Sequence, residues 1–526
     1  MTAFLIDYLR LIKVGSALAR YDVILPGDYH RRLPLIAQFG GAVMRLFGGR
    51  ASGRQGERLA RALEQLGPTY IKLGQFLATR PDVFGVEVTT DLSRLKDKLP
   101  AFPATQARSA LDTEFGETQS QELFPELSEA IAAASLAQVH KLKIGDQYKA
   151  VKILRPNIER RITKDLRAIK RAARLAERIS PSSRRMRPVA FTETVSASME
   201  KELDLRLEAG GGDELRDIAL NDNYVHIPAI DWTRSGQRVL TTEWIDGRPL
   251  TAPDALDQAG LDRAELATRV TRGFLSQAIN YGVFHADMHE GNMIVMPDGH
   301  LALVDFGLIG RVGIAERRFL AEILWGFIQR DYKRIAEVHF EAGYVPADRS
   351  VGDFAQALRS VGEPIHGKNA ADVSMSRLLL QLLDFTHIFG MQLRPELVLL
   401  QKTMVQVEGV ARTIDPHHDI WAAADPIVKD WIKNNLGPVG AAKLSLETVS
   451  DVTDRLKRLP QIMDKLEAHL NQSGSEIRPS HQFPWWAWVI FGAGLTGALV
   501  ALKRVKEKSE VEREGIPVTS LREISL

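Results

Sequence analysis

The sequence predicts an α+β protein of two lobes, one built around strands and the other mainly helical. Two observations support this fold class. Short apolar segments at 148–154, 293–296 and 301–304, the last two separated by a turn, are typical of strands. From 316 to 470, apolar residues instead recur at helical spacing. Breaks in these helices are expected near Pro346, Pro364 and Pro438.

Composition limits the class of protein. The chain has 526 residues, enough for one large domain with extensions. Its 45% hydrophobic and 25% charged residues are ordinary for a globular protein. The net charge of +2 gives no indication of nucleic-acid binding, and the absence of cysteine excludes disulfides, thiolate chemistry and cysteine-based zinc sites.

We expect seven segments along the chain. They are basic amphipathic helices over 1–61, a helical extension over 62–125, a strand-containing lobe over 126–246, a helical lobe over 247–470, a linker over 471–484, a membrane helix over 485–502 and a polar tail over 503–526. The basic start would be attracted to anionic lipid headgroups, although an ordinary solvated helix face explains it equally well.

Two short motifs stand close together in the second lobe, His285–Asn292 and Asp305–Gly307. Two strands with a Pro-Asp-Gly turn between them are predicted to join these motifs as a hairpin. The hairpin would bring the oxygens of Asn292 and Asp305 side by side, and oxygen ligands suit Mg²⁺.

The spacing of Asp287, Asn292 and Asp305 is that of protein kinases. There the first Asp orients the attacking group, and the Asn and the second Asp hold a metal on the ATP phosphates. A rival interpretation is a metal-hydrolase cluster of His285, Asp287 and His289. That rival leaves the Asp305–Gly307 motif unexplained.

A kinase site also needs a loop over the phosphates and a lysine on a nearby strand. Lys152 lies in the predicted strand at 148–154, and an Ala-rich segment without glycine precedes it. We predict that this segment is the nucleotide loop, although alanine is the best helix former and a plain helix is the alternative. Its candidate nucleotide-binding residues are Ile131, Ala132, Ala133, Ala134, Ser135, Leu136, Ala137, Gln138 and Val139.

The lysine needs a carboxylate to orient it. Residues 200–209 carry several carboxylates at i, i+4 spacing, which predicts a helix, and Gly210–Gly212 is expected to end it. A plain charged surface is the usual explanation for such a run. The separation from Lys152 is far longer than in ordinary protein kinases, which predicts an insertion in the first lobe.

Several motifs in order resemble the UbiB family of atypical kinases. The segment Leu66–Gln75 is similar to the family's K-x-G-Q signature, and Ala132–Ser135 is similar to its Ala-rich loop. Its E-x-D motif corresponds to Glu202 and Asp204, and its lysine-pairing carboxylate to Glu208. Thr242–Gly247 resembles the hinge after the fifth strand.

The resemblance implies a protein-kinase-like fold that binds ATP or ADP with Mg²⁺. Lys152, held by Glu208, would contact the phosphates, and Glu243 and Ile245 would lie along the nucleotide. Asp287 would orient water or a hydroxyl group.

The resemblance also implies that a charge pair closes the site to protein substrates. Lys72 and Gln75 would lie over the active site and pair with Glu202 and Asp204. Without the resemblance, Lys72 would be taken for a surface lysine.

The sequence departs from the family pattern at three positions. Met288 and Glu290 stand where the catalytic loop often has proline, and Ala137 stands where glycine is common. We expect these changes to affect the rigidity of the loops rather than their chemistry, because the chemically active positions are kept.

The segment 485–502 is uncharged, with tryptophans at its start and lysine and arginine after its end. Eighteen helical residues span about 27 Å, close to the thickness of a bilayer core. Small residues four apart would allow two copies to pair through this helix. A buried core helix is the alternative, and a single span would place the basic tail outside, against the positive-inside tendency.

Together these features predict a membrane-anchored atypical kinase or ATPase at the cytoplasmic face of the bacterial inner membrane. The resemblance implies support of ubiquinone biosynthesis, with membrane lipids, polyprenyl quinone precursors or quinone-pathway enzymes as partners. One alternative is a nucleotide-switched scaffold for those enzymes. Another is a polyprenylphenol hydroxylase component, but the chain offers neither a strand-linked G-x-G-x-x-G nor an iron triad.

Overall fold

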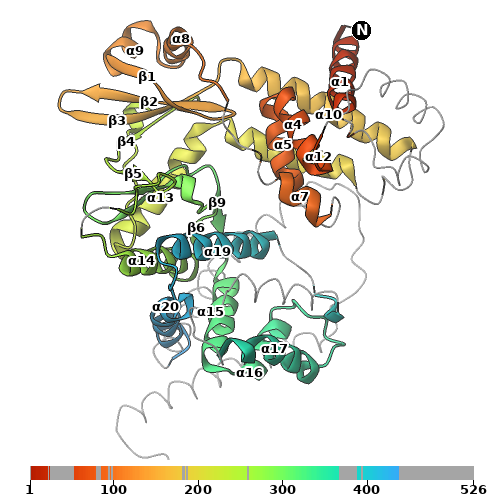
Figure 1. The fold of residues 1–526 in the computed structure, drawn as a ribbon, viewed down its shortest axis with the longest axis vertical. Helices are drawn as coiled ribbons and strands as arrows, with labels where there is room; N and C mark the ends of the chain where they lie inside the picture. The colour runs from red at the N-terminus through yellow and green to blue at the C-terminus, as the bar shows by residue number, and fades with distance from the viewer. Residues whose placement is uncertain are drawn as a thin grey trace, which may run out of the picture. The chain divides into compact units, whose positions relative to one another are not determined.

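The computed structural model describes residues 2–21, 52–78, 85–92, 99–179, 187–257, 260–366, 388–391 and 395–437, with residues 23, 95 and 184. These residues form mixed helix and sheet, in agreement with the α+β prediction (Figure 1). Described helices in the first part of the chain are α1 (Thr2–Arg20), α4 (Gln55–Leu66), α5 (Pro68–Ala78), α7 (Val86–Leu92), α8 (Ala104–Phe115) and α9 (Glu117–Leu123).

Helices α4, α5 and α7 pack around one apolar cluster. Leu63, Tyr70 and Leu92 are buried in it. Gly74 of α5 lies against this cluster, since a Cβ there would be 2.4 Å from Leu95 and 2.7 Å from Leu63. The helix that carries the K-x-G-Q segment is therefore held on one face by close packing.

An antiparallel sheet follows in the order β1 (Glu126–Ala133), β2 (Ala137–Ile144), β3 (Gln147–Leu154) and β4 (Val239–Glu243). Alternate residues of a strand face opposite sides of a sheet. Val151 and Ile153 pack with residues of α8 on one side, and Leu154 packs with helical residues from the segment after β3 on the other. Lys152 therefore faces the same side as Leu154.

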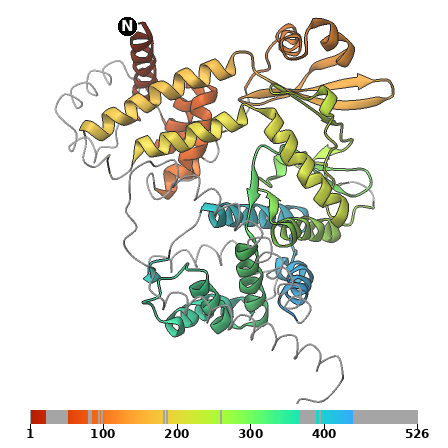
Figure 2. The ribbon, with the colours of Figure 1, turned by 180° about the vertical axis from the view of Figure 1, so that it is seen from behind.

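The expected insertion consists of α10 (Ile158–Ile179) and α12 (Pro188–Glu202), which pack along each other (Figure 2). The prediction of one helix over 200–209 that ends at the glycines is wrong. Helix α12 ends at Glu202, and α13 (Leu205–Asp222) runs through Gly210–Gly212. Gly211 and Gly212 are there because a Cβ would lie 2.8 Å from Ile309 and 2.7 Å from Phe306, respectively.

The second lobe begins with β5 (Arg248–Pro249) and α14 (Arg263–Ser276), which continues as a wider helical turn over Gln277–Tyr281. Four short strands follow, β6 (Val283–His285), β7 (Met293–Val295), β8 (Leu301–Leu303) and β9 (Ile309–Arg311). The predicted hairpin is present as β7 paired antiparallel with β8, and β6 pairs with β9.

Helices complete the described part of this lobe. They are α15 (Ile314–Gln329), α16 (Tyr332–Glu341), α17 (Val351–His366), α19 (Pro395–Ile414) and α20 (Ile420–Asn435). The expected break near Pro346 falls between α16 and α17. Helix α17 runs through Pro364 to His366, and the residues that follow, 367–387, lie outside the described part of the chain. Pro438 lies outside the described residues.

The hydrophobic core of the second lobe joins α14, α19 and α20 to the hairpin strands. Phe274, Met293, Leu303 and Val407 are buried together in it. Helices α14 and α19 lie side by side in both views (Figures 1 and 2). The strands that carry the two motifs thus pack against α14, α19 and α20.

Across the described part of the chain, every helix is too short or too polar to cross a bilayer. The predicted membrane helix over 485–502, its linker and the polar tail lie outside the described residues.

Candidate active site

Lys152 forms the centre of a cluster of opposite charges. Its Nζ lies 2.7 Å and 2.9 Å from the two carboxylate oxygens of Glu208 on α13, and 3.4 Å from Oδ1 of Asp305. Burial alone would lower the pKa of Lys152, but Asp305 and Glu208 outweigh it, and the pKa is raised. Lys152 therefore stays charged at neutral pH.

The hairpin brings Asn292 and Asp305 together. The backbone N–H of Val304 donates to the carbonyl of Asn292 at 2.9 Å, and the Asn292 amide donates to the carbonyl of Asp287 at 3.0 Å. This bond commits the amide nitrogen of Asn292 to the loop, so its side-chain oxygen is the candidate metal ligand. Lys152 lowers the pKa of the Asp305 carboxyl, so that this group is a charged oxygen donor. This donor set fits Mg²⁺.

Asp305 has an unusual backbone. Its φ of 65° is in the left-handed region, which few residues other than glycine adopt. Its Oδ1 accepts a hydrogen bond from the N–H of Gly307 at 3.3 Å, which supports the tight turn. Strained conformations of this kind are concentrated at functional sites.

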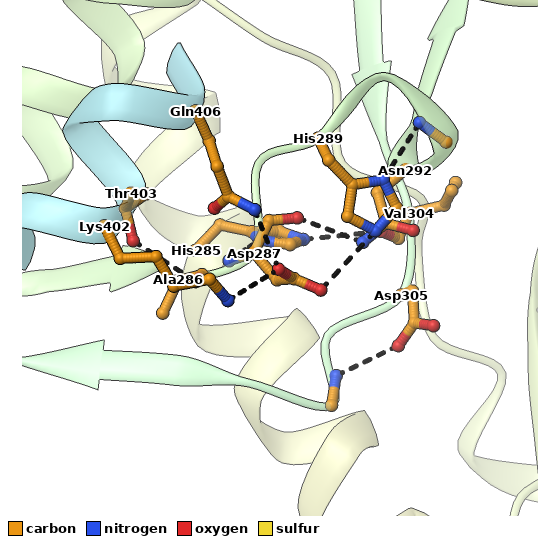
Figure 3. Close-up of polar contacts among 12 residues, drawn as sticks. His285, Ala286, Asp287, His289, Asn292, Val304, Asp305, Lys402, Thr403 and Gln406 are labelled. Atoms are coloured by element: carbon orange, nitrogen blue, oxygen red, sulfur yellow. Dashed lines mark hydrogen bonds and ion pairs between the residues drawn. The ribbon is translucent and has the colours of Figure 1, made fainter. Parts of the chain in front are cut away.

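Asp287 is surrounded by hydrogen-bond donors (Figure 3). Its Oδ1 lies 3.0 Å from Nζ of Lys402 and accepts from Nε2 of Gln406 at 3.2 Å. Its Oδ2 lies 3.5 Å from Nε2 of His289. Burial would raise the pKa of Asp287, but His289, Lys402 and Gln406 together hold it well below its ordinary value. Asp287 is therefore ionised at neutral pH.

His285 has a structural position. It is fully buried, its Nδ1 accepts from the N–H of Asp287 at 3.1 Å, and its Nε2 donates to the carbonyl of Val304 at 3.3 Å. Both ring nitrogens are therefore occupied, and His285 cannot ligate a metal in this arrangement. Nor do the described residues bring three metal-binding histidines or carboxylates together. The geometry thus gives the metal-hydrolase rival no support.

The Ala-rich segment forms a hairpin turn between two strands, so its helical alternative is wrong. The predicted loop over Ile131–Val139 is shorter than expected, since β1 ends at Ala133 and β2 begins at Ala137. The N–H of Ala134 donates to the carbonyl of Ala137 at 2.8 Å, which closes the turn.

Two polar side chains among the candidate nucleotide-binding residues are buried. Ser135, in the middle of the turn, is buried, and its hydroxyl has no partner among the described residues. Gln138, another candidate nucleotide-binding residue, has a buried side-chain amide that pairs with the backbone of Phe102, at 2.8 Å and 3.2 Å. The side chain of Gln138 therefore links β2 to the segment before α8 and is committed there.

The hinge segment Thr242–Gly247 begins in β4, the last strand of the four-stranded sheet. Glu243 is the last residue of β4, and its carboxylate accepts from the N–H of Ala229 at 3.2 Å and lies 3.3 Å from Nε2 of His226. Ile245, two residues further on, is buried. The hinge is thereby fixed to the segment before β4.

Lys72 of α5 forms an ion pair with Glu202, the last residue of α12, at 2.9 Å. The charge of Lys72 also contributes, after that of Lys152, to the lowered pKa of Asp305. Gln75 lies one turn further along α5.

The proposed pairing of Asp204 with this segment needs correction. Asp204 caps α13, where its carboxylate accepts from the N–H of Arg206 at 3.1 Å and pairs with the Arg206 guanidinium at 2.6 Å. The reason is that α12 ends at Glu202, so Asp204 does not continue the face of that helix.

Two of the three departures from the family pattern, at Met288 and Glu290, have local explanations. Met288 is fully buried in the core of the second lobe. Glu290 accepts a hydrogen bond from the hydroxyl of Thr413 on α19 at 2.8 Å, and the hydroxyl of Thr403 on the same helix donates to the carbonyl of Ala286 at 3.2 Å. Contacts with α19 therefore restrain the loop where prolines are absent.

Two groups of site residues were not found from the sequence. Lys402 and Gln406 lie more than one hundred positions after Asp287 and belong to no motif there. Arg155 donates to the carbonyl of Ala134 at 3.0 Å and 2.8 Å and to that of Pro100 at 2.9 Å, and so holds the Ala-rich turn. The only sequence feature that could have pointed to Arg155 is its position three residues after Lys152.

Two family models match the chain. The ABC1 atypical kinase-like domain matches residues 94–339, and the UbiB helical domain matches residues 358–419. A solved structure described as the complex of Rv3197 with erythromycin, from Mycobacterium tuberculosis, is 24% identical and covers 74% of this chain and 96% of its own, with a TM-score of 0.49.

Curated relatives match over most of their length. A "Probable protein kinase UbiB" from Marinobacter nauticus is 36% identical over 426 residues, which are 80% of this chain and 78% of the relative. One of the same name from Pseudomonas paraeruginosa is 32% identical over 515 residues, 94% of each chain. On this similarity, and with a kinase-like fold, the chain belongs to the UbiB family of atypical kinases.

Proposed function

We propose that the protein is a membrane-anchored ATPase or atypical kinase that uses Mg-ATP in support of ubiquinone biosynthesis. The observation that carries the proposal is the convergence of Lys152, Glu208 and Asp305 beside Asn292. Phosphoryl transfer needs little covalent help, so positioned charges of this kind can supply most of the catalysis.

Each group has an assigned task in the proposal. Lys152, oriented by Glu208, binds the α- and β-phosphates of the nucleotide. Asn292 and Asp305 hold Mg²⁺, which neutralises phosphate charge when bound. Asp287 orients the attacking water or hydroxyl through its ionised carboxylate. The Ala-rich turn and the hinge residues Glu243 and Ile245 enclose the nucleotide.

Family resemblance and sequence features support a proposal for the acceptor and the location. We propose a polyprenyl quinone precursor or a quinone-pathway enzyme as the partner, at the cytoplasmic face of the inner membrane. The Lys72–Glu202 ion pair supports a small-molecule or lipid role, because a closed charge pair whose lysine acts electrostatically on Asp305 hinders a folded protein substrate.

The test is Mg²⁺-dependent ATP hydrolysis by the purified full-length protein, with and without anionic vesicles and a phenolic precursor mimic. Asp305→Asn removes a charged metal ligand and should lower turnover by at least about 100-fold. The matched control is Asp348→Asn, an exposed aspartate before α17, which should keep the wild-type rate.

The outcomes separate the candidate functions. Turnover that rises with vesicles and is lost in Asp305→Asn supports the proposal. Nucleotide binding without turnover under every condition supports a nucleotide-switched scaffold. Turnover that Asp305→Asn leaves unchanged would exclude the assigned site.

A further inference from the structure

Helix α19 contributes side chains to the candidate active site from far along the chain. Lys402 and Gln406 are four residues apart on this helix, and both contact Oδ1 of Asp287, at 3.0 Å and 3.2 Å. Residues four apart lie on the same face of a helix. One face of α19 therefore meets one oxygen of the candidate catalytic carboxylate (Figure 3).

An ordinary surface ion pair would not need this arrangement. Lys402 is 45% exposed, and exposed pairs contribute little to stability. The pair, however, does not stand alone, because Gln406 is the second donor and its own Oε1 is buried with no partner among the described residues. A buried amide oxygen left without a partner is costly, which indicates that the amide is held for its contact with Asp287.

The loop is also fixed to the same helix on both sides of Asp287. Thr403 is fully buried and donates to the carbonyl of Ala286, the residue before Asp287. Thr413 donates to Glu290, three residues after it. These contacts set the distance between α19 and the backbone of Asp287, so that Lys402 and Gln406 reach its side chain in one defined orientation.

We infer that Lys402 and Gln406 are positioning residues, which fix the carboxylate of Asp287 for the reaction assigned above. Two donors on Oδ1 prevent the carboxylate from rotating. Oδ2, whose contact with His289 is longer at 3.5 Å, is left to accept the hydrogen bond of the attacking hydroxyl or water. The inference rests on the proposed function, and it makes α19 of the UbiB helical domain part of the active site.

The test compares Lys402→Met with Lys402→Arg in the full-length protein. We expect Lys402→Met to lower kcat for Mg-ATP hydrolysis by about 10- to 100-fold, because a small misplacement of a catalytic group has a large effect on rate. The Kd for Mg-ATP should stay within about twofold, since Lys152, Asn292 and Asp305 are untouched. Lys402→Arg keeps a cation at this position and should recover part of kcat.

The matched control is Lys429→Met on α20, another exposed lysine of the same helical region. It should keep the wild-type kcat and Kd. Thermal unfolding of each variant identifies a purely structural effect, which would lower Tm and would not be corrected by arginine. Gln406→Ala provides an independent variant and should lower kcat in the same direction with Kd unchanged.

Other results would overturn the inference. Wild-type kcat in Lys402→Met, or a loss that appears in Kd and Tm instead of kcat, would show that Lys402 does not position Asp287. A wild-type protein without Mg²⁺-dependent turnover, measured beside Asp305→Asn, would overturn the proposed function and this inference with it. Turnover in the wild type together with an unaffected Lys402→Met would overturn the inference alone.

Discussion

The surroundings of several buried side chains determine whether each side chain carries a charge. Lys152 and Asp305 are close partners, and each favours the charged form of the other. His339 on α16 illustrates burial without a countercharge. Its Nδ1 donates to the carbonyl of Ile335 at 2.8 Å, and its ring packs against Phe354 with centroids 5.2 Å apart.

The titration of His339 gives a prediction about stability. Burial lowers the pKa of His339 to about 4, while its ordinary value is 6.5. Between these values the unfolded state binds the extra proton, so His339 stabilises the fold fully above pH 6.5 and loses this contribution as the pH falls towards 4. The loss amounts to at most about 3 kcal/mol of unfolding free energy.

The measurement is Tm against pH for the wild type and for His339→Phe, which keeps an aromatic ring but does not titrate. We expect the variant to lose less Tm than the wild type between pH 6.5 and 4. The exposed His417→Gln serves as control and should follow the wild type. Parallel curves for the wild type and His339→Phe would show that His339 does not carry this dependence.

At the scale of elements, α13 connects the lysine-pairing carboxylate to the Asp305–Gly307 motif. It carries Glu208 in its first turn and Gly212 one turn later, against the ring of Phe306. One helix thus positions both Glu208 and Phe306. The close approach requires glycine inside a helix, where glycine is otherwise unfavourable.

Gly212→Ala tests this contact. The new Cβ would lie 2.7 Å from Cδ2 of Phe306, so the ring or the helix must shift. We expect a loss of about 1–3 kcal/mol in unfolding free energy and slower Mg-ATP hydrolysis, because Phe306 adjoins Asp305.

Gly210→Ala is the matched control on the same helix. Position 210 is exposed, and a Cβ there meets no atom within 4 Å. Alanine favours helix over glycine, so this variant should gain about 0.5–1 kcal/mol with unchanged turnover. Equal effects of the two substitutions would contradict the packing argument.

At the scale of the whole molecule, two segments outside the active site are candidates for membrane contact. The sequence predicts a membrane helix over 485–502 and a basic amphipathic start over 1–61. The two segments would attach to a membrane with different strength. An inserted helix resists high salt and alkaline extraction, whereas electrostatic attraction to headgroups is screened by salt.

A variant that ends at residue 470 distinguishes attachment by the predicted membrane helix from attachment by the basic start. We expect the full-length protein to stay in the membrane fraction after carbonate extraction, and the shortened variant to be released while it retains Mg-ATP hydrolysis. Salt-sensitive retention of the variant would assign the remaining attachment to the basic start. Full retention after carbonate would contradict the membrane-helix prediction.

Much of the site could be predicted because its chemistry is local in sequence. Asp287, Asn292 and Asp305 are joined by one hairpin, so their spacing already defines their proximity. Lys152 in the central strand and the turn before it follow from strand patterns in the same way. Helix boundaries were harder to predict, because the glycines at 210–212 lie inside α13, where they allow close packing, and do not end a helix.

What the sequence determined by itself was the kinase-like class, the family and the core of the candidate site, because these depend on residue types at short separations. The tertiary structure decided which distant side chains complete the site. Lys402 contacts Asp287 from 115 residues away in the sequence. The carboxylate of Asp204 pairs with the Arg206 guanidinium. Such contacts depend on how helices pack, and packing is set by side-chain shape across the whole lobe rather than by any local pattern.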